Sequence, residues 1–188
     1  MPWALRDTSV YIGHWERGLY RETLAAVQHT FVVRHSAVVL SELRRGARTP
    51  TARRLVDALF RVAVVQWEPT AGDWWNAGKL IQAIGDAQGW DGAKRRDFQN
   101  DALIALTARR HGATVVTANR RDFALLEGVL RVTVLPVWTS TRARSWIATS
   151  RAGNSSPEAR QSPAVPLADH LAANRPGPPA QCRRTAPP

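Results

Sequence analysis

The chain has 188 residues and a formal net charge of +11, from 26 Lys and Arg against 15 Asp and Glu. This length favours a single domain with one substantial core. Cys182 is the only cysteine, which excludes an internal disulfide bond and a multi-cysteine zinc site. No apolar run approaches the roughly 18 residues of a membrane span, and the first residues lack the apolar segment of a signal peptide. We therefore expect a soluble protein of the reducing cytoplasm, with no membrane association.

The positive charge is spread along the chain. Residues 1–137 contain 19 basic and 13 acidic side chains, and residues 138–188 contain 7 and 2. A basic balance in both parts suggests a polyanionic partner such as a nucleic acid. Only two of the 26 basic residues are lysines, so an arginine-rich coding background is an alternative explanation for the excess.

Short β-branched runs alternate with helical patterns up to about residue 137. Strands are predicted at residues 3–6, 30–33, 62–65, 114–117 and 129–134. Helices are predicted at residues 19–28, 36–46, 49–60, 71–87 and 100–111, with a short one after Phe123, and residues 85–96 are expected to form a polar loop. This alternation predicts an α/β fold around a sheet of mainly parallel strands.

The composition changes after Trp138. Eight of the twelve prolines lie in residues 157–188, and Ser, Ala and Arg dominate there without strong periodicity. Such a segment buries too little apolar area to offset an ordering entropy of roughly 1 to 2 kcal/mol per residue. We expect residues 1–137 to form the domain and residues 138–188 to form a disordered basic tail.

Four acidic residues lie near the predicted junctions of strands and helices. Asp7 follows the first strand, and Asp122 lies five residues after the strand at 114–117. Asp101 is placed near the start of the central helix, where its side chain points back toward the strand ends. Glu42 has Val38 and Val39 as helical neighbours, which places its carboxylate beside apolar side chains. Sites in open parallel sheets form at the carboxyl ends of the strands, so these acids are candidates for one shared site.

Each acid also has a simpler structural explanation. Asp7 can cap the helix that follows it, and Asp122 can cap a turn. Glu42 can pair with Arg45 one helical turn later, and Asp101 can be a first-turn acid favoured by the helix dipole. Taken singly these explanations are the stronger ones, whereas the ordered set of four favours a common site.

Four short motifs, taken in order, resemble those of one protein family. They read Asp7-Thr8-Ser9, then Ser41-Glu42-Leu43 closing at Gly46, then Asn100-Asp101-Ala102-Leu103-Ile104-Ala105, then Val116-Thr117-Ala118-Asn119-Arg120-Arg121-Asp122-Phe123. This set is similar to the acid-bearing motifs of the PIN domain, above all in the VapC-like ribonuclease toxins of bacterial toxin-antitoxin pairs. Two positions depart from the pattern: Arg6 stands where an apolar residue is usual, and Asn119 where the fourth acid often lies, which leaves Asp122 as the carboxylate.

The resemblance covers residues 3 to 137 and implies both a fold and an activity. The implied fold is a three-layer α/β/α sandwich around a central, mainly parallel sheet. The implied activity is that of an Mg²⁺- or Mn²⁺-dependent endoribonuclease, which hydrolyses RNA phosphodiester bonds as the toxin of a toxin-antitoxin pair. A cognate antitoxin that covers the acidic pocket and a second copy of the chain in a homodimer are the implied protein partners.

The resemblance also implies roles for individual residues. Asp7, Glu42, Asp101 and Asp122 would be the catalytic and metal-binding residues, and Thr8, Ser9, Thr117 and Asn119 would hydrogen-bond the carboxylates or a phosphate. Oxygen ligands without His or Cys suit a hard ion such as Mg²⁺ or Mn²⁺. The alternative is a non-catalytic or non-toxic nucleic-acid-binding or RNA-processing module, whose affinity would come from the arginines and the tail.

Overall fold

The computed structural model describes residues 1–138, so the predicted tail lies outside the described residues except for Trp138. A five-stranded sheet runs through the described part, with every strand pair parallel and the strand order β3-β2-β1-β4-β5. The strands are β1 (Trp3–Arg6), β2 (Val32–Ser36), β3 (Gln66–Trp67), β4 (Thr114–Thr117) and β5 (Val134–Pro136). The predicted parallel sheet is confirmed.

Seven helices connect and cover these strands within residues 1–138. They are α1 (Thr8–Arg17), α2 (Arg21–Thr30), α3 (Ala37–Gly46), α4 (Pro50–Val62), α5 (Ala71–Gln88), α6 (Gly92–Arg110) and α7 (Arg120–Leu130). In this part of the chain, no helix has both the length and the hydrophobicity needed to cross a membrane.

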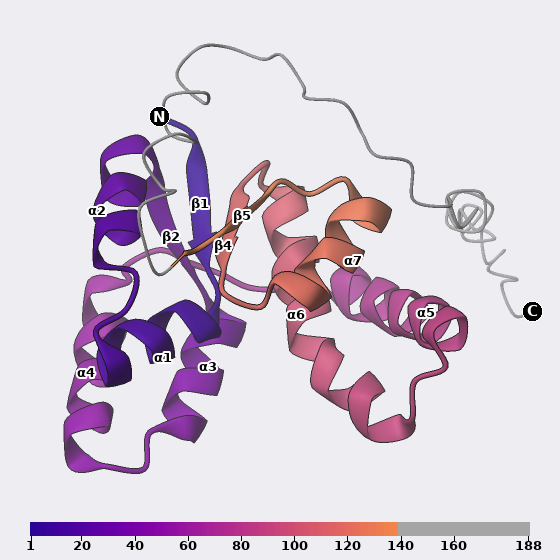
Figure 1. Cartoon of the computed structure of the whole chain (residues 1–188), viewed down its shortest axis with the longest axis horizontal. Helices are drawn as coiled ribbons and strands as arrows, with labels where there is room; N and C mark the ends of the chain where they lie inside the picture. Colours follow the sequence, from indigo (N-terminus) through magenta and orange to yellow (C-terminus); the bar gives the residue numbers. More distant parts are fainter. Residues whose placement is uncertain (139–188) are drawn as a thin grey trace, which may run out of the picture. The chain divides into compact units, whose positions relative to one another are not determined.

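The two central strands divide the core into two layers, because successive strand residues point to opposite faces of a sheet. Ala4 of β1 and Val116 of β4 pack in a cluster with residues of α1 and α2. Leu5 and Val115, the residues adjacent to Ala4 and Val116 in each strand, pack in a larger cluster with residues of α3 to α7. Figure 1 shows α2 on one side of the strands and α5 and α6 on the other. The predicted three-layer α/β/α arrangement is therefore confirmed.

Arg6, at the end of β1, is the position that departs from the apolar strand pattern. The residue is half-buried, and its Nε and Nη2 atoms are enclosed without a hydrogen-bond partner among residues 1–138.

The central helix α6 begins earlier than predicted. The side chain of Asp91 accepts a hydrogen bond from the backbone N–H of Lys94 at 2.7 Å, which caps the helix and starts it at Gly92. The predicted loop at residues 85–96 is therefore wrong, since only residues 89–91 lie between α5 and α6. The first half of α6 is polar because it faces solvent, with Phe98 as its one buried residue before Asp101, whereas Ala102 to Ala108 are all buried.

Two predicted strands are misplaced. Val62 is the last residue of α4, and the strand predicted at 62–65 is replaced by the two-residue strand β3 at Gln66–Trp67. Val64 is 89% exposed, so its β-branched side chain lies on the surface and not in the core. The strand predicted at 129–134 is also wrong, because α7 continues to Leu130 and β5 begins only at Val134.

Candidate active site

Asp7 lies at the carboxyl end of β1, enclosed by polar partners. Its backbone N–H donates to the carbonyl of Val116 at 2.9 Å, which holds it against the end of β4. The residue is only 3% exposed. Its Oδ2 atom accepts hydrogen bonds from Ser9 Oγ at 2.5 Å and from Thr117 Oγ1 at 2.8 Å. Asp7 occupies the N-cap position of α1, yet its side chain makes no capping hydrogen bond. Helix capping therefore does not explain this carboxylate.

The same two hydroxyl groups also attach the loop after β4. Ser9 Oγ accepts from the backbone N–H of Ala118 at 3.1 Å, and Thr117 Oγ1 accepts from the backbone N–H of Asn119 at 2.9 Å. Each hydroxyl donates to Asp7 and accepts from the loop, so both of its hydrogen-bonding functions are used. The path of residues 117–119 is thus coupled to the orientation of Asp7.

Glu42 reaches the same region from α3. Ser36 caps this helix by accepting a hydrogen bond from the N–H of Val38 at 3.2 Å. The Glu42 carboxylate accepts from Thr8 Oγ1 at 2.5 Å on Oε2 and from Asn100 Nδ2 at 2.8 Å on Oε1. Within the described residues no ion pair joins Glu42 to Arg45, so the simple pairing within α3 does not hold.

Asp101 and Asp122 are bridged by one amide. Asn119 Nδ2 lies 2.9 Å from Oδ2 of Asp101 and 2.9 Å from Oδ2 of Asp122, and it donates to both. Asp101 lies in the middle of α6, not near its start, so the helix dipole does not explain its position. Its carboxylate nevertheless lies near the strand ends, as the sequence indicated.

Two further residues belong to this cluster and were not predicted as site residues. Asn100 holds Glu42, and Lys94 Nζ lies 2.9 Å from Oδ1 and 2.7 Å from Oδ2 of Asp122. Lys94 and Asp101 are seven residues apart in α6, which is about two helical turns and places both on one face. That spacing is a usable signal, but it becomes visible only when the helix is known to begin before Lys94.

The electrostatics show that the four acids act on one another. The pKa of Asp101 is raised to about 8, first by burial and then by the charges of Asp7, Asp122 and Glu42, whereas Lys94 lowers it. Burial also raises the pKa of Asp7, against the lowering effect of its hydrogen bonds from Ser9 and Thr117. Acids distant in sequence therefore converge closely enough to disfavour a charge on Asp101.

The donor set suits a hard divalent cation. Carboxylate oxygens with amide and hydroxyl neighbours are the ligands that Mg²⁺ and Mn²⁺ prefer, and a cation would offset the repulsion that raises the Asp101 pKa. As the side chains stand, no group of three or more Asp, Glu, His or Cys residues within residues 1–138 is arranged to hold an ion. Lys94 and Asn119 occupy oxygens of Asp122 and Asp101 instead.

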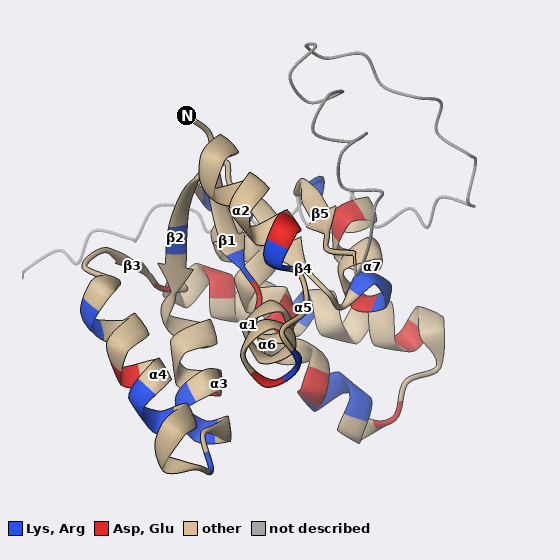
Figure 2. Cartoon of the chain, turned by 60° about the vertical axis from the view of Figure 1, so that its left-hand side comes forward, with Lys and Arg blue, Asp and Glu red and all other residues tan. Residues whose placement is uncertain are grey.

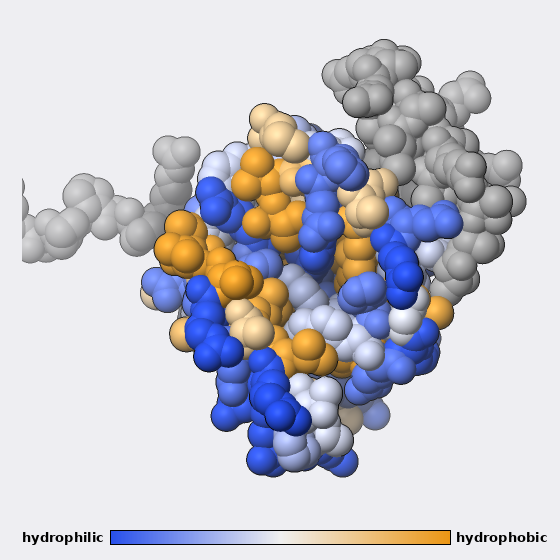
Figure 3. All heavy atoms as spheres, turned by 90° about the vertical axis from the view of Figure 1, so that its left-hand side faces the viewer, coloured by the Kyte–Doolittle hydropathy of each residue, from blue (hydrophilic) through white to orange (hydrophobic). Residues whose placement is uncertain are grey.

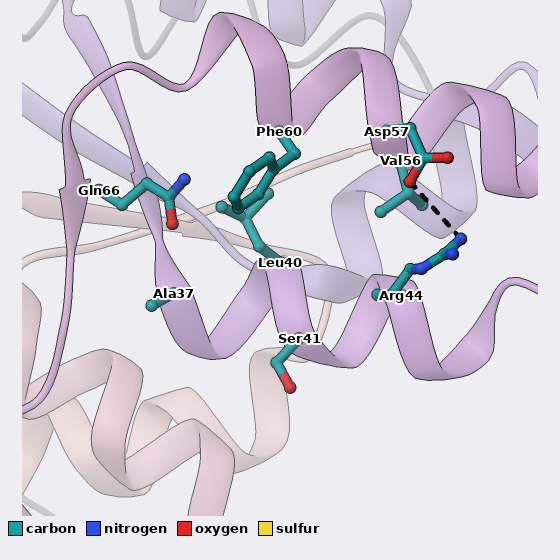
Figure 4. Close-up of a pocket in the computed structure, with 8 residues that line it drawn as sticks. All are labelled: Ala37, Leu40, Ser41, Arg44, Val56, Asp57, Phe60 and Gln66. Atoms are coloured by element: carbon teal, nitrogen blue, oxygen red, sulfur yellow. Dashed lines mark ion pairs between the residues drawn. The ribbon is translucent and has the colours of Figure 1, made fainter.

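Apolar surface lies next to the acidic cluster. A pocket of about 390 Å³ opens between α3 and α4, lined by Leu40, Val56 and Phe60 among others (Figure 4). A second pocket of about 260 Å³ includes Glu42, Asn100 and the half-exposed Trp74 in its lining. Figure 3 shows apolar surface bordered by strongly hydrophilic residues on the left-hand side of the Figure 1 view, where α4 lies.

Solved structures of low sequence identity share this fold. A chain of VapBC2 from Rickettsia felis, bound to a promoter DNA fragment, aligns with a TM-score of 0.54 and 19% identity, covering 72% of this chain and 98% of that one. A chain of VapBC-1 from nontypeable Haemophilus influenzae gives 0.54 and 19%, with 71% and 97% covered. DNA-bound VapBC from Salmonella typhimurium gives 0.52 and 21%, with 72% and 98% covered.

A family model describes most of the domain. No curated protein sequence matches the chain. The model of the PIN domain matches residues 4–129, a range that includes Asp7, Glu42, Asp101 and Asp122. With the parallel sheet and the acids at its carboxyl edge, this match assigns the chain to the PIN domain family.

Proposed function

We propose that this protein is a metal-dependent endoribonuclease that hydrolyses RNA phosphodiester bonds, and that it is the toxin of a toxin-antitoxin pair. The observation that carries the proposal is the convergence of the four acids near the strand ends, where Asn119 bridges Asp101 and Asp122 at 2.9 Å each. The raised pKa of Asp101 supports it, because the charges of Asp7, Asp122 and Glu42 add to the effect of burial. Strongly perturbed carboxyls at the ends of parallel strands mark a candidate catalytic site. The PIN family match and the VapC-like motifs support the choice of phosphodiester hydrolysis over other metal-assisted reactions.

The contacts of the residues support a role for each of them. A bound Mg²⁺ or Mn²⁺ would supply a polarised water and offset charge on the phosphate. Asp7 and Asp101 would hold the ion, and Glu42, fixed by Thr8 and Asn100, would bind it or orient a water. Ser9 and Thr117 keep Asp7 in place, and Asn119 sets the separation of Asp101 from Asp122.

The substrate side of the proposal rests on exposed positive charge. Arg120 and Arg121 are exposed at the start of α7, directly before Asp122. Figure 2 shows further basic residues along α3 and α4. Arg45, Arg53 and Arg54 are exposed on these helices, as is Arg44, which pairs with Asp57 at 3.5 Å. Such residues can hold phosphates of a single-stranded RNA on either side of the acids, and binding of this kind weakens steeply with salt.

The antitoxin is proposed to cover the apolar pocket between α3 and α4. Phe60 is 58% exposed there, and it lies opposite Leu40 of α3, the helix that also carries Glu42 (Figure 4). An apolar helix seated in this pocket would bury Phe60 and lie close to the acids. That VapBC complexes share the fold supports a cognate antitoxin as the partner.

A homodimer is proposed through α5. Trp74 is 50% exposed and Trp75 is 71% exposed on this helix, and aromatic side chains of this size are enriched at interfaces. Sedimentation of the wild-type chain against Trp75→Ser is the test. A monomeric wild-type chain, or a dimer unaffected by the substitution, would contradict this interface.

The nuclease proposal is tested with the full chain and labelled RNA, both single-stranded and structured. We expect cleavage with Mg²⁺ or Mn²⁺, none in EDTA, and none with Asp7→Asn or Asp101→Asn. Asp97→Asn is the matched control, because Asp97 is an exposed acid one turn before Asp101 on α6.

Other outcomes separate the alternatives. RNA that is bound in EDTA but never cleaved would indicate a binding module without catalysis. RNA cleavage by the purified protein without growth arrest when the protein is induced in cells would support the nuclease activity and contradict the role as a toxin. For the toxin, arrest should occur with wild type and disappear with Asp101→Asn.

A further inference from the structure

One of the four acids in the cluster, Asp122, is paired with a cation of the chain itself. Within residues 1–138, Lys94 is the only Lys or Arg that forms an ion pair with any of the four acids, and it contacts both oxygens of Asp122. The other acids accept hydrogen bonds from uncharged side chains, which are Ser9 and Thr117 for Asp7, Thr8 and Asn100 for Glu42, and Asn119 for Asp101. The cluster is therefore asymmetric in charge.

The position of the Lys94 ammonium is fixed from several directions. Its backbone N–H is bonded to Asp91, and its Nζ lies 5.3 Å from the ring centre of Trp90 and 5.8 Å from that of Phe98. These two rings pack edge to face at 4.7 Å, and Phe98 is fully buried. The side chains of Lys94 and Asp122 are 34% and 11% exposed, so water only partly screens the pair. The ammonium group of Lys94 is thus held in a fixed position next to Asp122.

Helix formation does not account for a lysine at this position. A cation in the first turn of a helix is disfavoured by the helix dipole, and Lys94 lies in the first turn of α6. Of the 26 basic residues in the chain, only Lys79 and Lys94 are lysines. A compact ammonium with three donors can contact both carboxylate oxygens of Asp122 while it lies against the two rings.

We propose that Lys94 serves as a tethered cation that neutralises Asp122 and limits the site to one divalent ion, held by Asp7, Glu42 and Asp101. This inference rests on the proposed metal-dependent function and specifies its ion count. Both oxygens of Asp122 are bonded to the ammonium of Lys94, and one also accepts from Asn119, so Asp122 is the acid at which an incoming ion would have to replace a positive charge. A second divalent ion would have to displace the ammonium, and it would be repelled by the first ion and by Lys94 together.

Lys94 is therefore a positioning residue. The ammonium keeps Asp122 in place and, through the shared amide of Asn119, sets the orientation of Asp101. Loss of the ammonium would free both Asp122 oxygens and open a second cation position between Asp101 and Asp122.

The test counts bound Mn²⁺ on the full chain by electron paramagnetic resonance, without substrate. We expect one ion per chain for wild type and two for Lys94→Met. Lys94→Arg keeps the positive charge and should bind one ion per chain. The double variant Lys94→Met/Asp122→Asn should also bind one ion, because it removes the carboxylate of the second position. Lys79→Met is the matched control on α5 and should bind one ion, because Lys79 contacts none of the four acids among the described residues.

The outcomes separate this inference from the proposed function. Two ions on wild type, or a count for Lys94→Met that stays at one, overturns the role of Lys94 and leaves the metal-dependent nuclease standing. No ion on wild type overturns both. Circular dichroism confirms that each variant is folded, and if Lys94→Met does not fold, the wild-type count together with Lys94→Gln decides in its place.

Discussion

The carboxyl ends of the strands and the outer part of α4 differ in which kind of side chain they bury and which they expose. At the strand ends, Asp7 is 3% exposed and Asp122 is 8% exposed, and both are hydrogen-bonded. Along and after α4, Phe60 is 58% exposed and Val64 is 89% exposed. One region buries charge, and the other exposes apolar surface.

Both arrangements cost stability, and each points to a different use. Buried carboxylates need partners because desolvation disfavours their charged form, whereas exposed apolar groups forgo the burial that stabilises a core. The first suggests chemistry inside the protein, and the second suggests a surface covered by another chain. Helix α3 joins the two regions, because it carries Glu42 at the acidic cluster and Leu40 in the apolar pocket.

The largest effect is expected from the buried acids. We predict that Asp101→Asn lowers RNA cleavage by at least about 100-fold, or roughly 3 kcal/mol, because it removes one of the carboxylates proposed to hold the catalytic ion. The same variant should be at least as stable as wild type without metal at pH 8, because the other three acids no longer repel a charge there. Cleavage rates and thermal melts on the same samples test both statements, and a parallel loss of stability and activity would count against a catalytic role.

Much of the acidic cluster followed from local sequence patterns. Asp7 directly follows a strand, and Thr117 ends another, so the parallel sheet brings them to one edge whatever the loops do. The expected neighbours also lie in place, because Thr8, Ser9, Thr117 and Asn119 all hydrogen-bond to the acids. The catalytic roles of the four acids stay predictions, which Asp7→Asn and Asp101→Asn test for two of them.

The sequence was less informative where tertiary contacts decide the structure. Val62 to Val65 have the composition of a buried strand, but Val62, Val64 and Val65 are exposed. Pairing with β2 begins only at Gln66 and Trp67, of which Trp67 is buried. The contact of Lys94 with Asp122 was not predicted, because the polar first half of α6 has the composition of a loop. Its contact with Asp122 spans 28 residues, and local periodicity carries no information about such a pair.

A matched pair of valines sharpens the contrast between the two regions. Val115 in β4 is fully buried and Val64 is 89% exposed. We predict that Val115→Ala lowers the free energy of unfolding by about 2 kcal/mol, from lost burial and a residual cavity, and that Val64→Ala changes it by less than about 0.5 kcal/mol. Urea unfolding measures both values. Equal losses would show that Val64 packs in the core and that the surface at the end of α4 has been misassigned.

The buried acids near the strand ends should make stability fall as pH rises. The pKa of Asp101, raised to about 8, means that the folded chain holds a proton that the unfolded chain releases from about pH 4 upward. Stability without metal, and Tm with it, should therefore fall between about pH 4 and pH 8. Melts across this range test the prediction, with Asp101→Asn expected to flatten the fall and Mg²⁺ to reverse it most at pH 8. A fall that persists unchanged in Asp101→Asn would place its origin elsewhere.

The smallest difference concerns the two helix caps that begin α3 and α4. Ser36 accepts from Val38 N at the start of α3, and Thr49 accepts from Ala52 N at the start of α4. Replacing either by Ala should cost about 1 kcal/mol or less of stability, because each loses one capping hydrogen bond. Only Ser36→Ala should also reduce RNA cleavage, since α3 positions Glu42 against Thr8 and Asn100, whereas α4 carries none of the four acids. Cleavage reduced equally by Thr49→Ala would mean that α3 and α4 move as one unit. The apolar surface and the acidic cluster would then not be structurally independent.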